Sequence, residues 1–154
     1  MHEDHPQDEA SVEKQFAGTW RLVSWVHQLA DGTTRQDPKS AAFFIYSDPG
    51  YVCYVGMNPK RSEWKSATAP TLDEMALGLG NNGFYCYCAA AEVHAKKGFI
   101  LMHLEVDKIP NMVGKTRKRW FKFEGPNRLA LTIDPAENSL PVIESTLVWE
   151  RVQK

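Results

Sequence analysis

The chain lacks the features that define several large classes of protein. Its 154 residues contain no apolar run near the ~20 residues of a membrane-spanning helix, so we expect no membrane partner. The formal net charge is -1, which gives no electrostatic reason to expect nucleic acid. The acidic, polar N-terminus is the reverse of a secretory signal, and we therefore expect a cytoplasmic protein.

Cysteines and catalytic signature motifs are also scarce. Three cysteines do not make a disulfide framework, and Cys86 and Cys88 stand two apart on one predicted strand, so we expect reduced thiols. Those two lack a second cysteine pair, and we predict neither a metal site nor a cofactor. There is no glycine-rich phosphate loop, Gly-x-Ser-x-Gly elbow or His-Glu-x-x-His pair. Nucleotide-binding, serine-nucleophile and zinc-protease functions have no support.

What the chain does contain is a series of short runs with strand periodicity, separated by turn sequences such as Asp31-Gly32 and Lys97-Gly98. Eight runs qualify as strands: Trp20–Gln28, Ala42–Tyr46, Tyr51–Met57, Phe84–Val93, Phe99–Val106, Arg117–Phe123, Arg128–Ile133 and Ser145–Val152. One short helix is predicted after Thr71, which forms a capping box with Glu74.

This pattern predicts an all-β fold, a closed antiparallel eight-stranded barrel with one short helix. We expect residues 1–15 to form a disordered or partly helical tail and residues 16–154 to form the barrel domain. A barrel of eight strands is just wide enough to hold one small ligand.

Two strands carry polar groups that suggest such a ligand. Alternate residues of a strand share a face, so His103 and Glu105 lie on the face of Phe99 and Leu101, and Arg119 lies beside Phe121. A face that mixes apolar groups with a base, an acid and a guanidinium suits a ligand cavity better than a core.

The opposite orientation of the first strand is an open alternative. Its other face is wholly apolar (Ile100, Met102, Leu104 and Val106) and could be the core face. His103 and Glu105 would then be solvated surface groups.

The direction of the second strand is clearer, because Lys118 and Lys122 belong in water and Arg119 must then point inward. A buried arginine has to be paired. The candidate partners are Glu105, Glu144, Glu150 or an anionic ligand, and a structural ion pair that closes the barrel is the alternative.

Tyrosines form the rest of the predicted lining. Glu92 and His94 belong in water, which turns Tyr85 and Tyr87 inward, where their hydroxyls could meet a ligand or simply be satisfied in the core. The pattern of residues 51–57 leaves its inward face undecided, and Tyr54 is included as a ligand-binding candidate.

Several motifs resemble those of a family of bacterial and fungal lipocalin-like domains. Gly18-Thr-Trp20 resembles the Gly-x-Trp of a first lipocalin strand, and Arg151 in the last strand is a candidate to cover Trp20. The central signature is matched in order by Tyr46-Ser-Asp-Pro-Gly-Tyr51, Glu92-Val93, Gly98, His103-Leu-Glu105, Pro110-Asn111, Val113-Gly114 and Arg119.

The resemblance spans about residues 16 to 152 and implies a barrel that binds a small molecule. It also favours an inward orientation of His103 and Glu105, because the family pattern keeps that pair together. The chain departs from the pattern at Ala91, where members often have tyrosine, and at Arg117, where they often have glutamine. These departures imply a roomier and more basic cavity.

We therefore expect a small hydrophobic, oxygenated molecule as the partner, of aromatic, polyketide or terpenoid type. One hypothesis is cofactor-free acid–base chemistry of isomerase, dehydratase, cyclase or lyase type. In it His103 transfers the proton, Glu105 orients His103, Arg119 stabilises an enolate or carboxylate, and Tyr87 donates to an oxyanion. The alternative is a binding protein or carrier with the same cavity and no turnover. A third alternative is an assembly role through an exposed strand edge, and a homodimer stays open.

Overall fold

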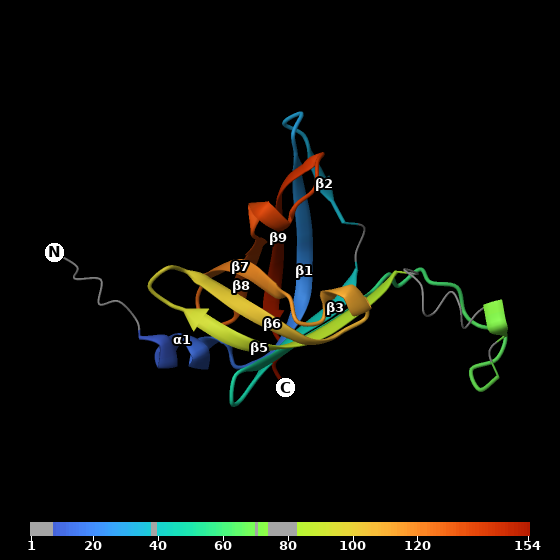
Figure 1. The fold of residues 1–154 in the computed structure, drawn as a ribbon, viewed down its shortest axis with the longest axis horizontal. Coiled ribbons are helices and arrows are strands. Elements are labelled where there is room, and N and C mark those ends of the chain that lie inside the picture. Colours follow the sequence, from blue (N-terminus) through green and yellow to red (C-terminus); the bar gives the residue numbers. More distant parts are fainter. Residues whose placement is uncertain (1–7, 38–39, 70, 74–82) are drawn as a thin grey trace.

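The computed structural model describes residues 8–37, 40–69, 71–73 and 83–154 (Figure 1). Within these residues one antiparallel sheet has the strand order β2-β1-β3-β4-β5-β6-β7-β8-β9, and β1 also pairs with β9. The strands are β1 (Gly18–Leu29), β2 (Thr34–Gln36), β3 (Ala41–Ser47), β4 (Tyr51–Met57), β5 (Phe84–His94), β6 (Phe99–Asp107), β7 (Thr116–Phe123), β8 (Arg128–Ile133) and β9 (Val142–Arg151). The β1–β9 pairing closes the barrel.

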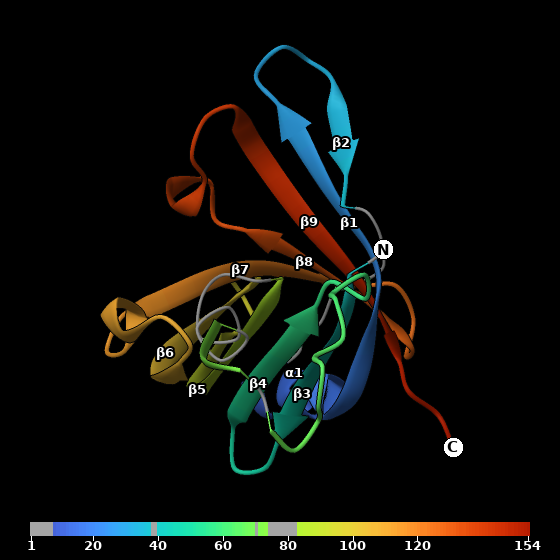
Figure 2. The same ribbon diagram turned by 90° about the vertical axis from the view of Figure 1, so that its right-hand side faces the viewer.

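The predicted closed antiparallel barrel of eight strands is confirmed, and each predicted run falls in one of its strands. The extra strand β2 pairs with the last part of β1. The β1–β2 hairpin projects beyond its neighbours in both views (Figures 1 and 2). Most of the helix predicted after Thr71 lies outside the described residues.

A helix and an arginine cover one end of the barrel. Helix α1 (Glu9–Phe16) brings Phe16 beneath Trp20, whose indole nitrogen donates to the Phe16 carbonyl at 2.8 Å. Both side chains are completely buried. The Arg151 guanidinium lies 4.3 Å from the centroid of the Trp20 ring, as the sequence predicted, and donates to the Gln15 carbonyl at 2.7 Å. This end is filled, and space for a ligand lies in the other half of the barrel.

The predicted orientation of β6 is wrong. Ile100, Met102 and Leu104 are buried in the core, whereas His103 and Glu105 are exposed on the outer wall. Burial of an unbroken apolar row releases more free energy than burial of a row that carries an imidazole and a carboxylate. The two predicted ligand contacts that share the outer row, Phe99 and Leu101, are turned away from the barrel interior as well.

Those outer residues have partners of their own on neighbouring strands. Nε2 of His103 lies 2.9 Å from a carboxylate oxygen of Glu92, and Nδ1 lies 2.9 Å from the Thr116 hydroxyl. Phe99 packs edge-to-face on Trp120, with ring centroids 5.3 Å apart. The outer face of β6 is therefore satisfied without a ligand.

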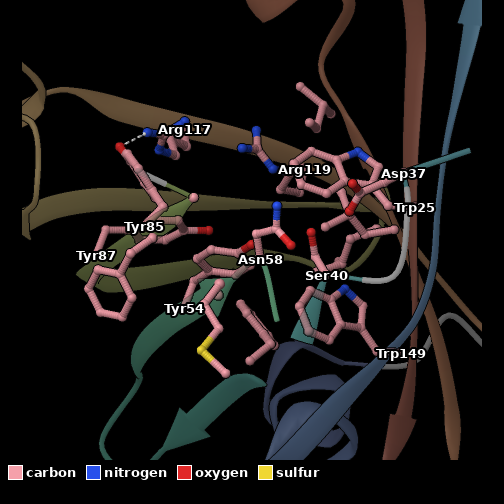
Figure 3. Close-up of a pocket in the computed structure, with 18 of the residues that line it drawn as sticks. Trp25, Asp37, Ser40, Tyr54, Asn58, Tyr85, Tyr87, Arg117, Arg119 and Trp149 are labelled. Atoms are coloured by element: carbon pink, nitrogen blue, oxygen red, sulfur yellow. Dashed lines mark hydrogen bonds between the residues drawn. The ribbon is translucent and has the colours of Figure 1, made fainter. Parts of the chain in front are cut away.

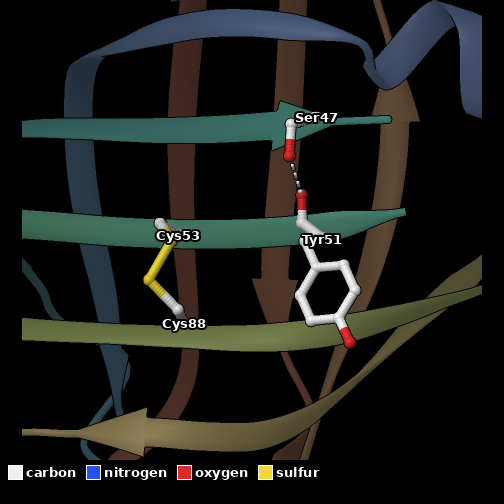
Figure 4. Close-up of a disulfide and its surroundings, with 4 residues drawn as sticks. All are labelled: Ser47, Tyr51, Cys53 and Cys88. Atoms are coloured by element: carbon white, nitrogen blue, oxygen red, sulfur yellow. Dashed lines mark hydrogen bonds between the residues drawn. A yellow bond between two sulfur atoms is a disulfide. The ribbon is translucent and has the colours of Figure 1, made fainter. Parts of the chain in front are cut away.

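The prediction of reduced thiols is also wrong for two of the cysteines. Cys53 of β4 and Cys88 of β5 stand opposite each other in the strand register and form a disulfide (Figure 4). Cys86 keeps a free thiol. Spacing along one strand misses such a bond, because the bonded partner comes from the facing strand.

Candidate functional site

The half of the barrel away from α1 holds a cavity of about 760 Å³ (Figure 3). Its walls come from most strands of the barrel and from the β2–β3, β4–β5, β6–β7 and β8–β9 connections. The lining consists of Trp25, Asp37, Ser40, Phe44, Tyr54, Gly56, Met57, Asn58, Gly83, Phe84, Tyr85, Tyr87, Ile109, Met112, Arg117, Arg119, Leu131, Ile133, Glu137, Leu147 and Trp149. Pockets that enclose small ligands are about 300–1,000 Å³ in volume. The cavity therefore has the size of a small-molecule site.

Three tyrosines from β4 and β5 form one wall. Tyr54 stacks on Tyr87 with centroids 5.4 Å apart and planes 15° from parallel, and Tyr85 meets Tyr87 edge-on at 6.1 Å. The predicted inward orientation of Tyr85 and Tyr87 is correct, and Tyr54 joins them. Gly56 makes this arrangement possible, because a Cβ there would collide with the Tyr54 ring, 2.9 Å from its Cζ.

The phenols of this wall are hydrogen-bond donors at neutral pH. Burial raises the pKa of Tyr54 to about 12 and that of Tyr85 to about 12. Burial also raises the pKa of Tyr87, whose hydroxyl has the Met102 sulfur as its partner at 3.8 Å. Removing water from an ionisable phenol disfavours the charged phenolate.

Arg117 extends along the tyrosine wall from β7. Its Nη2 donates to the Tyr85 hydroxyl at 2.6 Å and lies 3.6 Å from a carboxylate oxygen of Asp107, whose side chain is fully buried. The Tyr85 hydroxyl in turn donates to Asp107 at 2.7 Å. Arg117 also lies over the Tyr87 ring, 5.0 Å from its centroid. Its charge is thus matched by a carboxylate directly behind it.

Arg119 points inward as predicted, but its partner is none of the three glutamates proposed from the sequence. Its Nη1 lies 3.0 Å from Glu137, in the short 3₁₀ helix η2 (Pro135–Glu137), and also donates to the Lys118 carbonyl at 2.9 Å. The other oxygen of Glu137 accepts from the Lys118 amide at 2.9 Å. Only 8% of the Arg119 side chain is exposed, against 28% of the Glu137 side chain, so this ion pair is partly buried.

Negative charges around the cavity outnumber the positive ones. Two arginines, Arg117 and Arg119, face three carboxylates, those of Asp37, Asp107 and Glu137. A fixed anion in the cavity would gain attraction from each guanidinium and lose much of it to the neighbouring carboxylate. Arg117 adds a base where members of the family often have glutamine. The cavity nevertheless carries no excess of positive charge.

A second polar group of residues, which the sequence did not identify, lies at the other side of the cavity. Trp149 is 1% exposed, and its indole nitrogen has no hydrogen-bond partner among the described residues. Within the same described part of the chain, one carboxylate oxygen of Asp37 is buried and unpaired too. Ser40 lies on this side of the cavity as well (Figure 3). Trp149 is two residues from Arg151 and therefore shares its face of β9. The predicted position of Arg151 over Trp20 was thus a signal that Trp149 points inward.

The other predicted ligand contacts do not reach this cavity. Phe121 points inward, but it packs edge-on against Phe16 at the closed end, with centroids 5.0 Å apart. Near the mouth are Ile109 and Met112, which flank and end the short 3₁₀ helix η1 (Pro110–Met112), and Asn58 with Gly83.

Neither a metal centre nor a transmembrane helix is found in the part of the chain that the structure describes. Its histidine, cysteine and acidic residues form no group of three or more with the geometry to hold a metal ion. None of its helices is long and apolar enough to cross a membrane.

Comparison with known proteins places this barrel in a family. No curated protein matches the chain. Among solved structures, a redesigned β-barrel is 10% identical with a TM-score of 0.44, and the match covers 92% of this chain and 95% of that one. A mutant of the fluorescent protein UnaG is 12% identical with a TM-score of 0.42, covering 92% and 99%. The lipocalin-like domain has a fold that suggests small-molecule binding. The model of that domain family matches residues 17–152, and the chain belongs to the family.

Proposed function

We propose that the protein binds a neutral, largely apolar, oxygenated small molecule in its barrel and acts as a carrier or binding protein. The observation that carries this proposal is a cavity of about 760 Å³ with a tyrosine wall and two arginines already paired with carboxylates. Aromatic walls bind planar apolar groups, and a few placed donors fix their orientation. Tyr54 and the arginines supply such donors, whereas the hydroxyls of Tyr85 and Tyr87 already donate to Asp107 and to the Met102 sulfur.

The paired arginines favour a neutral ligand over an anion. Because Arg119 contacts Glu137 and Arg117 lies beside Asp107, an entering carboxylate meets a guanidinium whose charge is already offset. Asp37 adds a further negative charge to the lining. An ion gives up its hydration on entry and needs a strong counter-charge in return. A ketone, quinone, ether or phenol needs only the hydrogen bonds.

Binding is favoured over acid–base catalysis by the placement of the proton-transfer groups. The catalytic hypothesis relied on His103 with Glu105, and both side chains are on the outer wall. The phenols of Tyr54 and Tyr85, with pKa values of about 12, are donors and poor bases near neutral pH. Arg119 and Tyr87 keep their place in the cavity, as ligand anchors in this proposal.

The test uses two dyes with the same aromatic skeleton and different charge. N-phenyl-naphthylamine is neutral, and anilinonaphthalene sulfonate carries a fixed negative charge; both gain fluorescence on leaving water. We expect saturable binding of the neutral dye, at least about tenfold tighter than that of the sulfonate, which corresponds to roughly 1.4 kcal/mol. Equal or tighter binding of the sulfonate would refute the neutral-ligand proposal, and absence of binding by both dyes would refute ligand binding.

Matched variants locate the bound dye. Ile133→Glu places a carboxylate in the cavity wall, whereas Ile45→Glu places one on the exposed outer face of β3. We expect Ile133→Glu to weaken binding of the neutral dye about tenfold and Ile45→Glu to leave it unchanged. The reverse pattern would place the dye on the outer wall.

Prolonged incubation of the cognate ligand without chemical change supports a carrier, and conversion to a product contradicts it.

A further inference from the structure

Among the described residues, the indole nitrogen of Trp149 is a buried donor without an acceptor. The ring is held by Phe44, with centroids 5.8 Å apart, and by Tyr54, which meets it edge-on at 6.1 Å. Trp149 is 1% exposed, and no acceptor within the described residues reaches its nitrogen. A buried donor without an acceptor is costly, and most buried polar groups have a partner. Because Trp149 lines the cavity, an occupant of the cavity can supply one.

Asp37 is the matching acceptor. Its backbone amide donates to the Trp25 carbonyl at 2.8 Å, which fixes the residue beside β1, and one of its carboxylate oxygens is buried without a donor among the described residues. Its negative charge contributes, after burial and Tyr87, to the raised pKa of Tyr54, which indicates that it lies near the tyrosine wall. Figure 3 shows the side chains of Asp37, Ser40 and Trp149 on one side of the cavity and Tyr85 on the other.

We propose that Trp149 and Asp37 form a subsite for a hydroxyl group of the ligand. This inference rests on the proposed ligand-binding function and specifies which ligand the cavity selects. The oxygen of a hydroxyl accepts from the Trp149 nitrogen while its hydrogen is donated to Asp37, so one group satisfies both unpaired atoms. The Ser40 hydroxyl, which also lines the cavity, can serve either role.

A ketone, a carboxylate and an ammonium group each satisfy only one of the two residues. A ketone accepts from Trp149 and leaves Asp37 unpaired, and a carboxylate is repelled by Asp37. An ammonium group pairs with Asp37 and presents no acceptor to the indole. The ligand therefore has an oxygen-bearing group that faces Arg117 and Tyr85, an apolar body, and a hydroxyl at the Trp149 end (Figure 3).

The experiment measures displacement of N-phenyl-naphthylamine by three pairs of aryl methyl ketones built on benzene, naphthalene and biphenyl. Within each pair the far end of the ring system carries either a hydroxyl or a hydrogen. Three lengths are used so that one matches the span of the cavity. We expect the hydroxyl compound to bind about tenfold more tightly than its partner in at least one pair, because a hydrogen bond to a charged group adds to one from the indole.

Two variants test the assignment of the residues. Trp149→Phe removes the indole N–H, and Asp37→Asn removes the charged acceptor; each should reduce the tenfold hydroxyl preference to about threefold or less. The readout is the ratio of the two affinities within each pair, so a change in affinity that is common to both compounds leaves it unaltered. Trp120→Phe is the matched control, because Trp120 lies on the outer wall and its nitrogen donates to Asp134.

The outcomes separate this inference from the proposed function. Equal affinity within all three pairs, or a preference that survives both Trp149→Phe and Asp37→Asn, overturns the hydroxyl subsite while ketone binding still supports the carrier function. Failure of every ketone and of the neutral dye to bind overturns both. Loss of preference in Trp120→Phe to the same extent as in Trp149→Phe also overturns the subsite.

Discussion

Removal of one carboxylate from the cavity should lower the free energy of unfolding of the protein and change the ligand selectivity of the cavity. Glu137 holds Arg119 through a contact of 3.0 Å and accepts from the Lys118 amide with its other oxygen. Glu137→Gln keeps the shape of the side chain and the means to accept from Lys118, but it leaves the guanidinium without its counter-charge. Breaking a buried ion pair in this way costs about 3–5 kcal/mol. Because 28% of the Glu137 side chain is exposed, we expect about 2 kcal/mol.

The matched control is a similar pair on the surface. Glu124 lies 3.4 Å from Arg128, and roughly half of each side chain is exposed (53% and 44%). Because surface ion pairs contribute little, Glu124→Gln should change the free energy of unfolding by less than about 0.5 kcal/mol. Urea denaturation, followed by tryptophan fluorescence, measures both variants under identical conditions.

The same substitution should alter dye selectivity. With Glu137 neutral, Arg119 carries a net positive charge into the cavity, and the sulfonate dye should gain about tenfold in affinity relative to the neutral dye. The free energy of unfolding and the ratio of the two dissociation constants are thus two independent readouts. If Glu137→Gln behaves like Glu124→Gln in both, the cavity is not governed by the pairing of its arginines, and the argument for a neutral ligand fails.

Three further predictions concern single side chains. Gly56→Ala should destabilise the protein by about 1–3 kcal/mol in urea denaturation and weaken binding of the neutral dye, because its Cβ collides with the Tyr54 ring; unchanged binding would contradict the tight approach of this ring. His103→Gln should leave dye binding unchanged and shift the free energy of unfolding by less than about 0.5 kcal/mol, since His103 contacts Glu92 and Thr116 on the outer wall; weakened dye binding would return His103 to the site. The folded-state pKa of Tyr54 is raised to about 12, so its contribution to stability is fully present below its unfolded value near 10 and is lost as the pH rises through 12. Tyr54→Phe should therefore flatten the alkaline loss of unfolding free energy by about 2 kcal/mol, and an identical pH profile would show that this phenol titrates normally.

The barrel could be predicted from local signals because its strands are short, regular and separated by turn residues. Alternation also predicted the direction of Tyr85 and Tyr87, since β5 carries its charged residues on the opposite face. It predicted the direction of Arg119 because Lys118 and Lys122 occupy the outer face of β7. For β6 the alternation left both orientations possible. One face is wholly apolar, and the other mixes aromatic, aliphatic and charged residues. The family resemblance favoured the mixed face, and the free energy of burial placed the apolar face inside.

Long-range pairing set the limits of prediction at the site. Glu137 lies in a connection between β8 and β9 and reaches Arg119 on β7 only because the chain folds back there. No periodicity marks such a residue. Asp37 likewise follows the short strand β2, and it lines the same cavity as Trp149 of β9 only because the barrel closes. The disulfide between Cys53 and Cys88 depends on hairpin register in the same way.

The unpaired groups and the paired groups of the cavity, taken together, limit its ligand more narrowly than either does alone. Arg117 and Arg119 are strong donors whose charges are already offset, so they can orient an oxygen without requiring an anion. Trp149 and Asp37 are unpaired, so they gain from a ligand that brings both a donor and an acceptor. A molecule that suits both ends is neutral, oxygenated at two positions and apolar between them. Its affinity should therefore depend weakly on salt and strongly on the position of its hydroxyl group, because hydrogen-bond geometry and not net charge supplies the selectivity.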